Sequence, residues 1–570
     1  MITIDRRRFL VASAALAVGP MLGACSSGGK TSSGEETSSG ATSGAAPTTS
    51  SSGAASGPAA SSSAPGSGSS TAASGILPRY AAYNAISPDL AGTSEGVMPG
   101  YFTYPRNPKQ AFSAPPAQGL GSISILTQTY TPTPTAMDKN AFWKELNQRV
   151  GATMDLTLIP AVDYSNKLTT IVASGDLPDV VEFPRGTANQ PAILKSLFMD
   201  LNEYLSGDSV SEYPFLANIP TSAWVYGIAN GALYGVPQAR ALAGITTFYR
   251  KDIFAERGVS PDPGNYDEYV AMMKGVTDDK KNLWAFSTVS NTLQAVQMML
   301  DAPNGWAVED GKFVSAITDE RTKQAIGSVA TMVKDGLAHP DSFASSLTQN
   351  RTLYTSGRTA TYMGGYAAWD LLAQTAGDNV AALVEPKYDG GGDAPHFAGA
   401  GANATVSIKK GLASDKVKKI LAVLNWLATP FGAEEYLFRK FGIEGTDFTW
   451  KTDTPTLTDV GTSETALALP YITDSPTILG PGPKTRITAQ HDWDVRVMKS
   501  IKLDASAGLN STTDSTKGAA LAKLVADAQN DIFQGRKDLS SWDDVVKKWR
   551  SGGGDKIAEE YAAEYAGRPS

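Results

Sequence analysis

Residues 122–183 contain the stretch that decides the fold: SISIL at 122–126, MDLTLI at 154–159 and DVVEF at 179–183. Each is a short apolar or alternating run, which is typical of a β-strand. Between them, residues 140–150 and 164–173 carry apolar side chains at helical spacing. Strands separated by single helices predict a parallel sheet of the α/β class.

The same alternation indicates where a ligand lies. In open parallel sheets, ligands bind beyond the carboxyl ends of the strands. Those ends correspond to residues 127–130, 162–164 and 182–185. We therefore expect these three segments at the mouth of a cleft. Further along the chain, apolar spacing and stop signals predict helices at 322–334, 415–428, 519–533 and 543–550.

The N-terminus has the pattern of an export signal. Arg6, Arg7 and Arg8 precede a short apolar run, and Leu22-Gly23-Ala24-Cys25 follows it. The pattern resembles a twin-arginine lipoprotein signal spanning residues 1–24, with Cys25 as the acylated residue. This predicts a protein anchored by lipid on the outer face of the cell membrane. An ordinary cleaved secretory signal, and export by the general route, are the alternatives.

Two segments separate this signal from the main part of the chain. Residues 25–75 consist almost wholly of Ser, Gly, Ala, Thr and Pro, so they predict a disordered tether. Residues 76–118 are rich in Pro with scattered Tyr and Phe, and predict an extended segment without a fold of its own.

Composition excludes several classes of function. The formal net charge of −8 argues against binding to nucleic acid or to an anionic membrane surface. Cys25 is the only cysteine, and only three histidines occur in 570 residues, without a metal-binding motif. We therefore expect no metal, no other cofactor and no nucleic-acid partner.

Several short motifs follow one another along the chain between residues 174 and 557. They are SGDLPDV at 174–180, NGALYGVP at 230–237, FYRKDIF at 248–254, YTSGRTA at 354–360 leading to Trp369, FGIEG at 441–445, the segment from Trp542 to Trp549, and GGDKI at 553–557. Together they resemble the family 1 extracellular solute-binding proteins, which are similar to maltose-binding protein. The resemblance is greatest to a subgroup of large lipoproteins that includes oligosaccharide binders.

The resemblance implies an α/β fold of two lobes, a periplasmic-binding-protein-like clamshell with hinge crossings. Lobe 1 would comprise residues 119–238 and 396–441, and lobe 2 residues 239–395 and 442–565. The glycine-rich stretch 388–393 would be one crossing. The implied function is capture of a carbohydrate between the lobes and its delivery, unchanged, to the membrane permease of an ABC importer. The resemblance implies a monomer and no enzymatic activity.

Aromatic and planar polar side chains suit a sugar, because rings cover its C–H face and polar groups bond its hydroxyl edge. Candidate ligand-binding residues are Trp369, Asp370, Tyr366, Tyr249, Trp284, Trp306, Trp450, Trp493, Arg240 and Glu182. For each aromatic residue the alternative is a place in the core, and for Arg240 and Glu182 it is a structural ion pair. Trp426, Trp542 and Trp549 fall on helical stripes and are interpreted as core.

The nature of the ligand stays open. The subgroup often has a calcium loop after the helix that corresponds to residues 266–274, but residues 276–282 lack its alternating oxygen ligands, so we expect no calcium there. An acidic, neutral or cationic sugar is compatible with the sequence. The alternative function is a lipid-anchored glycoside hydrolase or lyase, with Asp492 and Asp494, or Asp370 and Glu182, as its carboxylates. A structural or adhesive surface lipoprotein is a third possibility.

Overall fold

The structure is a computed structural model, and it describes residues 75–566. The expected signal peptide, Cys25 and the tether up to residue 74 lie outside the described residues. None of the helices within 75–566 has the length and apolarity needed to cross a bilayer.

The first lobe is built on a five-stranded sheet in the order β2-β1-β3-β13-β6. The strands are β1 (Ser122–Thr129), β2 (Thr153–Pro160), β3 (Val180–Pro184), β6 (Val236–Ala239) and β13 (Ala402–Ile408). β1, β2 and β3 are parallel, whereas β13 runs antiparallel to both β3 and β6. The parallel arrangement predicted from residues 122–183 is therefore confirmed, together with the intervening helices α1 (Ala141–Val150) and α2 (Ala161–Ser174).

Local sequence explains these boundaries. The Asn140 side chain accepts a hydrogen bond from the backbone N–H of Trp143 and caps α1, and Gly151 ends the helix in the left-handed region at φ 78°. The remaining elements of this lobe are α3 (Gln190–Leu197), α4 (Asn202–Leu205), α5 (Pro214–Ala217), α6 (Thr221–Trp224), β4 (Ile228–Ala229), β5 (Ala232–Leu233), α13 (Ser414–Leu427), α14 (Glu434–Phe441), β14 (Phe448–Lys451), β15 (Thr454–Leu457) and α15 (Asp459–Glu464).

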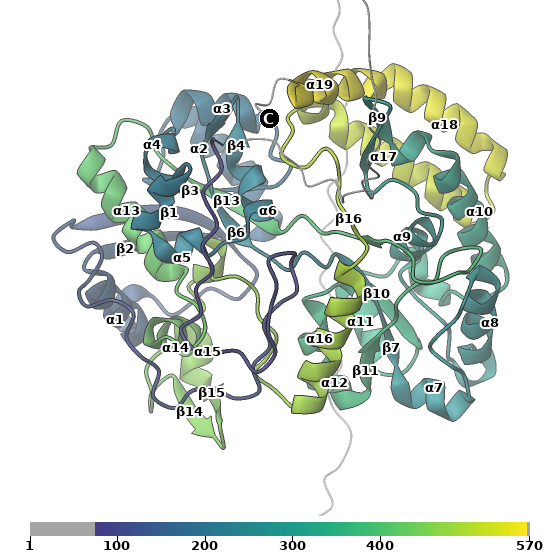
Figure 1. The fold of residues 1–570 in the computed structure, drawn as a ribbon, viewed down its shortest axis with the longest axis horizontal. Coiled ribbons are helices and arrows are strands. Elements are labelled where there is room, and N and C mark those ends of the chain that lie inside the picture. Colours follow the sequence, from purple (N-terminus) through teal and green to yellow (C-terminus); the bar gives the residue numbers. More distant parts are fainter. Residues whose placement is uncertain (1–74, 567–570) are drawn as a thin grey trace, which may run out of the picture. The chain divides into compact units, whose positions relative to one another are not determined.

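The second lobe has a three-stranded antiparallel sheet in the order β10-β7-β11, surrounded by helices (Figure 1). The strands of this sheet are β7 (Ile245–Arg250), β10 (Thr361–Gly365) and β11 (Val380–Ala382). The lobe also contains two two-stranded sheets, formed by β8 (Trp306–Glu309) with β9 (Lys312–Ser315) and by β12 (His396–Phe397) with β16 (Ile501–Lys502). Its helices are α7 (Lys251–Arg257), α8 (Tyr266–Val276), α9 (Val289–Met299), α10 (Glu320–Lys334), α11 (Leu347–Thr355), α12 (Ala368–Ala376), α16 (Lys484–Met498), α17 (Thr512–Phe533), α18 (Trp542–Trp549) and α19 (Asp555–Ala566). The predicted later helices are confirmed, and Trp426, Trp542 and Trp549 are buried in the cores.

The chain passes between the two cores three times after residue 119. The passages lie between Ala239 and Ala243, between Phe397 and Ala402, and between Ile472 and Leu479. The first two passages pair with each other, since Arg240 N donates to Gly401 O and Gly399 N donates to Leu242 O.

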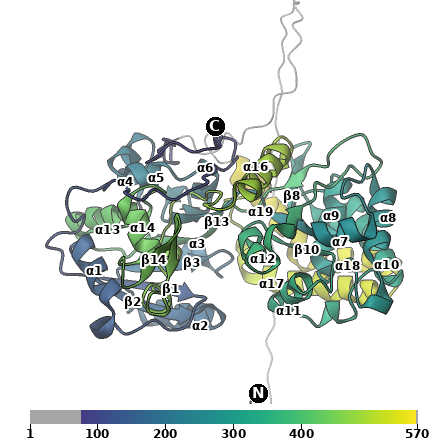
Figure 2. The same ribbon diagram turned by 90° about the horizontal axis from the view of Figure 1, so that it is seen from below.

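These passages correct the expected division of the lobes. Residues 396–397 pair with β16 and belong to the second lobe. Residues 442–472 belong to the first, because Leu467, Leu469 and Ile472 lie in its core and the β14–β15 hairpin packs beside α14 (Figure 2). The stretch 388–393 is no crossing: Tyr388 N bonds to Met299 O within the second lobe.

Residues 76–112 form an N-terminal strap that contacts both lobes. Ile76 and Phe112 pack against the first core, whereas Val97 and Met98 are buried in the second. Met98 N donates to the buried Asp494 carboxylate at 2.7 Å. The strap therefore links the lobes alongside the three later passages, although its sequence has no regular pattern.

This strap contact should make stability depend on pH. Burial raises the pKa of Asp494 to about 6, although the hydrogen bond from Met98 N–H and the charge of His491 both act to lower it. The charged carboxylate thus destabilises the native state above pH 6, and this cost disappears as pH falls toward 3.8. Burial lowers the pKa of His396 to about 4, so His396 destabilises the native state as pH falls from 6.5 to 4.

We expect Asp494→Asn to raise the free energy of unfolding by about 1–3 kcal/mol at pH 7.5, because the amide keeps an acceptor for Met98 without the buried charge. Below pH 6 the variant keeps only the opposing effect of His396, so its stability should fall more steeply with acid than that of the parent. Denaturant unfolding at pH 7.5, 6.0 and 4.5 checks both statements. Parallel stability curves for the two proteins would contradict them.

Candidate functional site

The site lies at one edge of the first-lobe sheet. β1, β2, β3 and β6 all end at this edge, because β13 is antiparallel to both of its neighbours and starts there. The residues that follow the strands therefore gather in one place: Tyr130 after β1, Arg185 after β3 and Arg240 after β6. This is the edge at which the sequence predicted the mouth of a cleft.

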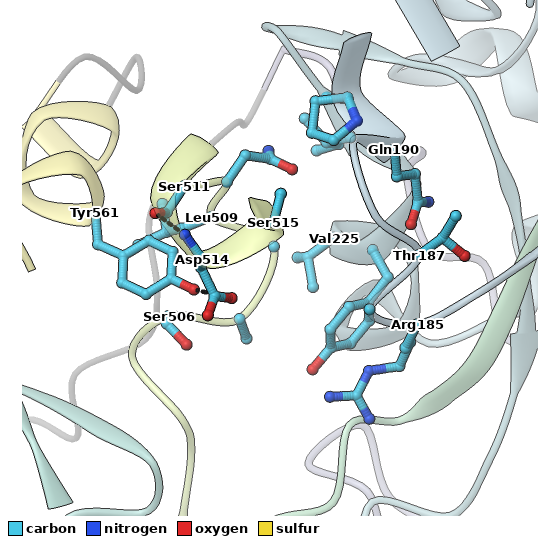
Figure 3. Close-up of a pocket in the computed structure, with 18 of the residues that line it drawn as sticks. Arg185, Thr187, Gln190, Val225, Ser506, Leu509, Ser511, Asp514, Ser515 and Tyr561 are labelled. Atoms are coloured by element: carbon cyan, nitrogen blue, oxygen red, sulfur yellow. Dashed lines mark hydrogen bonds between the residues drawn. The ribbon is translucent and has the colours of Figure 1, made fainter. Parts of the chain in front are cut away.

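A cavity of about 610 Å³ opens between this edge and the second lobe. Its first-lobe wall includes Phe183, Arg185, Thr187, Gln190 and Tyr226. Its second-lobe wall includes Trp306, Asp504, Ser506, Asp514 and Tyr561. Figure 3 shows the two groups of labelled side chains facing each other from opposite sides of the cavity.

Opposite charges face the cavity from the two lobes. The Arg185 guanidinium lies over the ring of Tyr226, 4.9 Å from its centroid. Burial raises the pKa of Asp504, while hydrogen bonds from Ser506 and the charge of Arg185 act in the other direction. Both Ser506 N and Ser506 Oγ donate to Asp504 Oδ1 at 2.8 Å. The Asp504 carboxylate is thus held by its own loop, and Arg185 reaches it only through the field across the cavity.

Aromatic side chains support the second-lobe wall. The Tyr561 hydroxyl donates to Asp514 Oδ2 at 3.1 Å, as drawn in Figure 3. Trp306 is half-buried and packs edge-on against Tyr561, with 5.3 Å between ring centroids, and against Trp549 at 5.9 Å. These contacts fix the wall so that it offers both apolar rings and carboxylate oxygens.

The two lobes come into close contact beside the cavity. Gly508 has a φ of 71°, and a Cβ at this position would lie 2.7 Å from Val225 O and 2.8 Å from Val225 Cβ. A glycine is therefore required both by the backbone conformation and by the approach of the first lobe.

Of the ten residues singled out from the sequence, Trp306 lines this cavity. Glu182 and Arg240 lie at the sheet edge: Glu182 is fully buried beneath it, and Arg240 is partly exposed. Tyr471 is a neighbour of both residues. Burial raises the pKa of Tyr471, the charge of Arg240 lowers it, and the charge of Glu182 raises it.

Trp369, Tyr366 and Trp493 come together, but in the core of the second lobe. Trp369 is 2% exposed, its ring lies 5.6 Å from that of Phe248, and Tyr366 stacks on Trp493 at 5.4 Å. The side chains of Val97 and Met98 from the strap complete this cluster. In this structure Trp369 therefore offers no open face for a sugar, and it occupies the core position that was the alternative.

The other four candidates do not line the cavity. Each has a structural neighbour that accounts for its position: Tyr249 packs on Phe254, Trp284 on His339, Trp450 beneath Arg106, and Asp370 pairs with Arg486. Their roles in binding stay predictions.

Sequence reasoning missed most of the second-lobe wall. Arg185 carried a signal, because it directly follows a predicted strand. Asp504, Asp514 and Tyr561 carried none, since they come from a loop, a helix start and the last helix, more than 300 residues from β3. Tyr226 lies in a three-residue 3-10 helix after α6, which is too short to give a periodic signal.

The sequence profile of the bacterial extracellular solute-binding proteins matches residues 132–434, which is more than half of the chain. The chain belongs to this family. The expected resemblance is confirmed. The match includes the first-lobe wall of the cavity and all three strands of the second-lobe sheet.

Individual proteins are similar over most of the chain. It is 23% identical over 440 residues to the polygalacturonan/rhamnogalacturonan-binding protein YtcQ of Bacillus subtilis, covering 73% of this chain and 86% of that protein. It is 21% identical over 473 residues to lipoprotein LipO of the same organism, covering 77% and 91%. The crystal structure of the N-glycan transport solute-binding protein NgtS of Streptococcus pneumoniae superposes with a TM-score of 0.57 at 17% identity, covering 78% and 98%. This last likeness confirms the two-lobed α/β fold.

The contrast between two tryptophans tests the division between core and cavity wall. We expect Trp369→Ala to lower the free energy of unfolding by about 3–5 kcal/mol, because it empties a fully buried aromatic site. Trp306→Ala should cost about 1–2 kcal/mol, since its ring is already half open to the cavity. Denaturant titration of both variants checks the order. A larger loss for Trp306→Ala would show that the wall, rather than the strap-covered cluster, carries the packing.

Proposed function

We propose that this protein captures an oligosaccharide in the cavity between its lobes and hands it, chemically unchanged, to an ABC importer. The observation that carries the proposal is the cavity wall itself, to which each lobe contributes an aromatic ring and planar polar groups. Tyr226 and Trp306 provide rings, and Arg185, Gln190 and Asp504 provide hydrogen-bonding groups.

The composition of this wall suits a pyranose. Its C–H face packs on an aromatic ring, and its vicinal hydroxyls bond to guanidinium, amide and carboxylate groups. Charged partners give stronger hydrogen bonds than neutral ones. A cavity formed by two lobes also allows release, because separating the lobes removes half of the contacts at once.

The similar proteins support a carbohydrate as the solute. One is named for binding polygalacturonan and rhamnogalacturonan, and another for the transport of N-glycans. They do not identify the sugar for this chain.

We propose that the protein works at the outer face of the cell membrane. Support comes from the lipoprotein pattern that ends at Cys25 and from the similarity to a Bacillus lipoprotein. In this proposal residues 1–24 direct export by the twin-arginine route, and acylated Cys25 anchors a monomer near its membrane permease.

Calorimetry against a panel of neutral and acidic oligosaccharides tests the proposal. Arg185→Gln should weaken binding of the best ligand about 10- to 100-fold, because a charged hydrogen bond contributes about 1.5–3 kcal/mol. Arg536→Gln is the matched control, since Arg536 pairs with Asp531 on the surface of the second lobe. If the two variants lose the same amount of affinity, the cavity is not the binding site.

Product analysis separates binding from catalysis. The bound oligosaccharide should be recovered at its original length after prolonged incubation with the purified protein. Shortened or unsaturated products would instead assign the protein to the hydrolases or lyases, with Asp504 and Asp514 as the carboxylates to examine.

A further inference from the structure

An aromatic platform lies at the sheet edge outside the cavity. Tyr130 is 62% exposed, and its ring centroid is 5.1 Å from that of Tyr471. Arg240 completes the group, with its guanidinium carbon 5.9 Å from the Tyr471 ring. We call Tyr130, Tyr471 and Arg240 the edge platform. None of the three lines the cavity.

Buried hydrogen bonds fix the position of Tyr130. Its hydroxyl donates to Gln128 Oε1 at 3.2 Å, and Gln128 Nε2 donates to Glu182 Oε1 at 2.6 Å. Glu182 Oε2 accepts from Thr127 Oγ1 at 2.7 Å and from Gln128 N at 2.8 Å. The exposed ring is thus linked through Gln128 to a fully buried carboxylate.

Tyr471 is anchored from below by its backbone. Its carbonyl oxygen accepts from Gln238 Nε2, and the Thr127 hydroxyl oxygen lies 3.3 Å from it. Asn403 Nδ2 in turn donates to Gln238 Oε1 at 3.3 Å. Side chains from β1, β6 and β13 therefore converge beneath this one residue, and the platform is built by the sheet rather than by a flexible loop.

Arg240 brings a positive charge that no carboxylate of residues 75–566 neutralises by an ion pair. Its Nη1 donates to Ala239 O at 2.9 Å, and its backbone N–H bonds to Gly401 O. A guanidinium has five N–H donors, so most of them remain available to a bound group. The available geometry suits a planar acidic group, which a guanidinium binds through two hydrogen bonds.

We propose that the edge platform is a second sugar subsite, in which a pyranose stacks on Tyr130 and its acidic substituent pairs with Arg240. This inference rests on the proposed function and adds the position, charge and minimum length of the ligand. Arg185 and Arg240 follow strands that are two positions apart in the sheet, or about 10 Å. One ligand that reaches both is an oligosaccharide rather than a single sugar.

The test uses the full chain, oligogalacturonides of one to six residues as acidic probes, and their methyl esters as neutral probes of the same shape. Acidic probes should bind more tightly than their esters, and affinity should rise with length until both subsites are filled. Arg240→Gln should weaken the acidic probes about 10- to 100-fold and reduce their preference over the esters, while the contribution of Arg185 remains. Tyr130→Ala should weaken both forms about 5- to 10-fold.

A control variant and the wider panel of sugars keep the outcomes distinct. Tyr130 is exposed, so Tyr130→Phe removes the bond to Gln128 but keeps the ring. It should bind both probes more tightly than Tyr130→Ala and more weakly than the parent, and its unfolding midpoint should be unchanged. Equal affinity for acid and ester, or unchanged affinity in Tyr130→Ala, overturns the subsite. If only neutral oligosaccharides from the wider panel bind, the subsite fails while the proposed function stands. If no oligosaccharide binds, the proposed function itself fails.

Discussion

Close backbone contact between two passages sets the relation of the lobes. Residues 240–244 and 398–401 run antiparallel and exchange backbone hydrogen bonds. A Cβ on Gly244 would lie 2.7 Å from Phe397 O and 2.8 Å from Gly399 N, so a larger residue cannot occupy this position without moving the pair apart. Because these passages begin where β6 ends and β13 starts, they meet the first lobe at its binding edge. Any change in the angle between the lobes therefore acts close to the residues proposed to bind the solute.

The strap adds a second constraint on that motion. It packs on the first lobe at both ends and inserts Val97 and Met98 into the second, where Met98 N bonds to Asp494. Tyr101 N also bonds to Leu479 O, at the end of the third passage. A movement of the lobes must either carry this segment along or break buried contacts. The strap thus favours a limited rotation about the passages over a wide separation of the two cores.

Local periodicity was enough to predict β1 to β3 and the helices between them, since each element buries one regular face. It also placed Arg185 at the ligand edge. It failed for Trp369, because the burial of a tryptophan depends on what covers it, and here the cover is the irregular strap. Periodicity also failed to assign residues 442–472 to the correct lobe. Leu467, Leu469 and Ile472 pack in the first core, but they do not belong to a regular apolar pattern. Tyr561 and Asp514 line the same cavity as Arg185 only because of the tertiary structure. Their spacing in the sequence therefore does not predict that they belong to the site.

The balance of donors and acceptors at the site follows from which charges are already satisfied. Glu182 accepts hydrogen bonds from Thr127 and Gln128, and Asp504 Oδ1 accepts two from Ser506, so part of the acceptor capacity of both carboxylates is used within their own lobe. The two arginines at the strand ends have no such carboxylate partner in an ion pair within residues 75–566; Arg185 rests on a ring, and Arg240 bonds to a backbone carbonyl. The edge therefore presents more unused donors than acceptors to the solute. A ligand rich in acceptor oxygens, and above all one carrying a carboxylate, is the chemical complement of that surface.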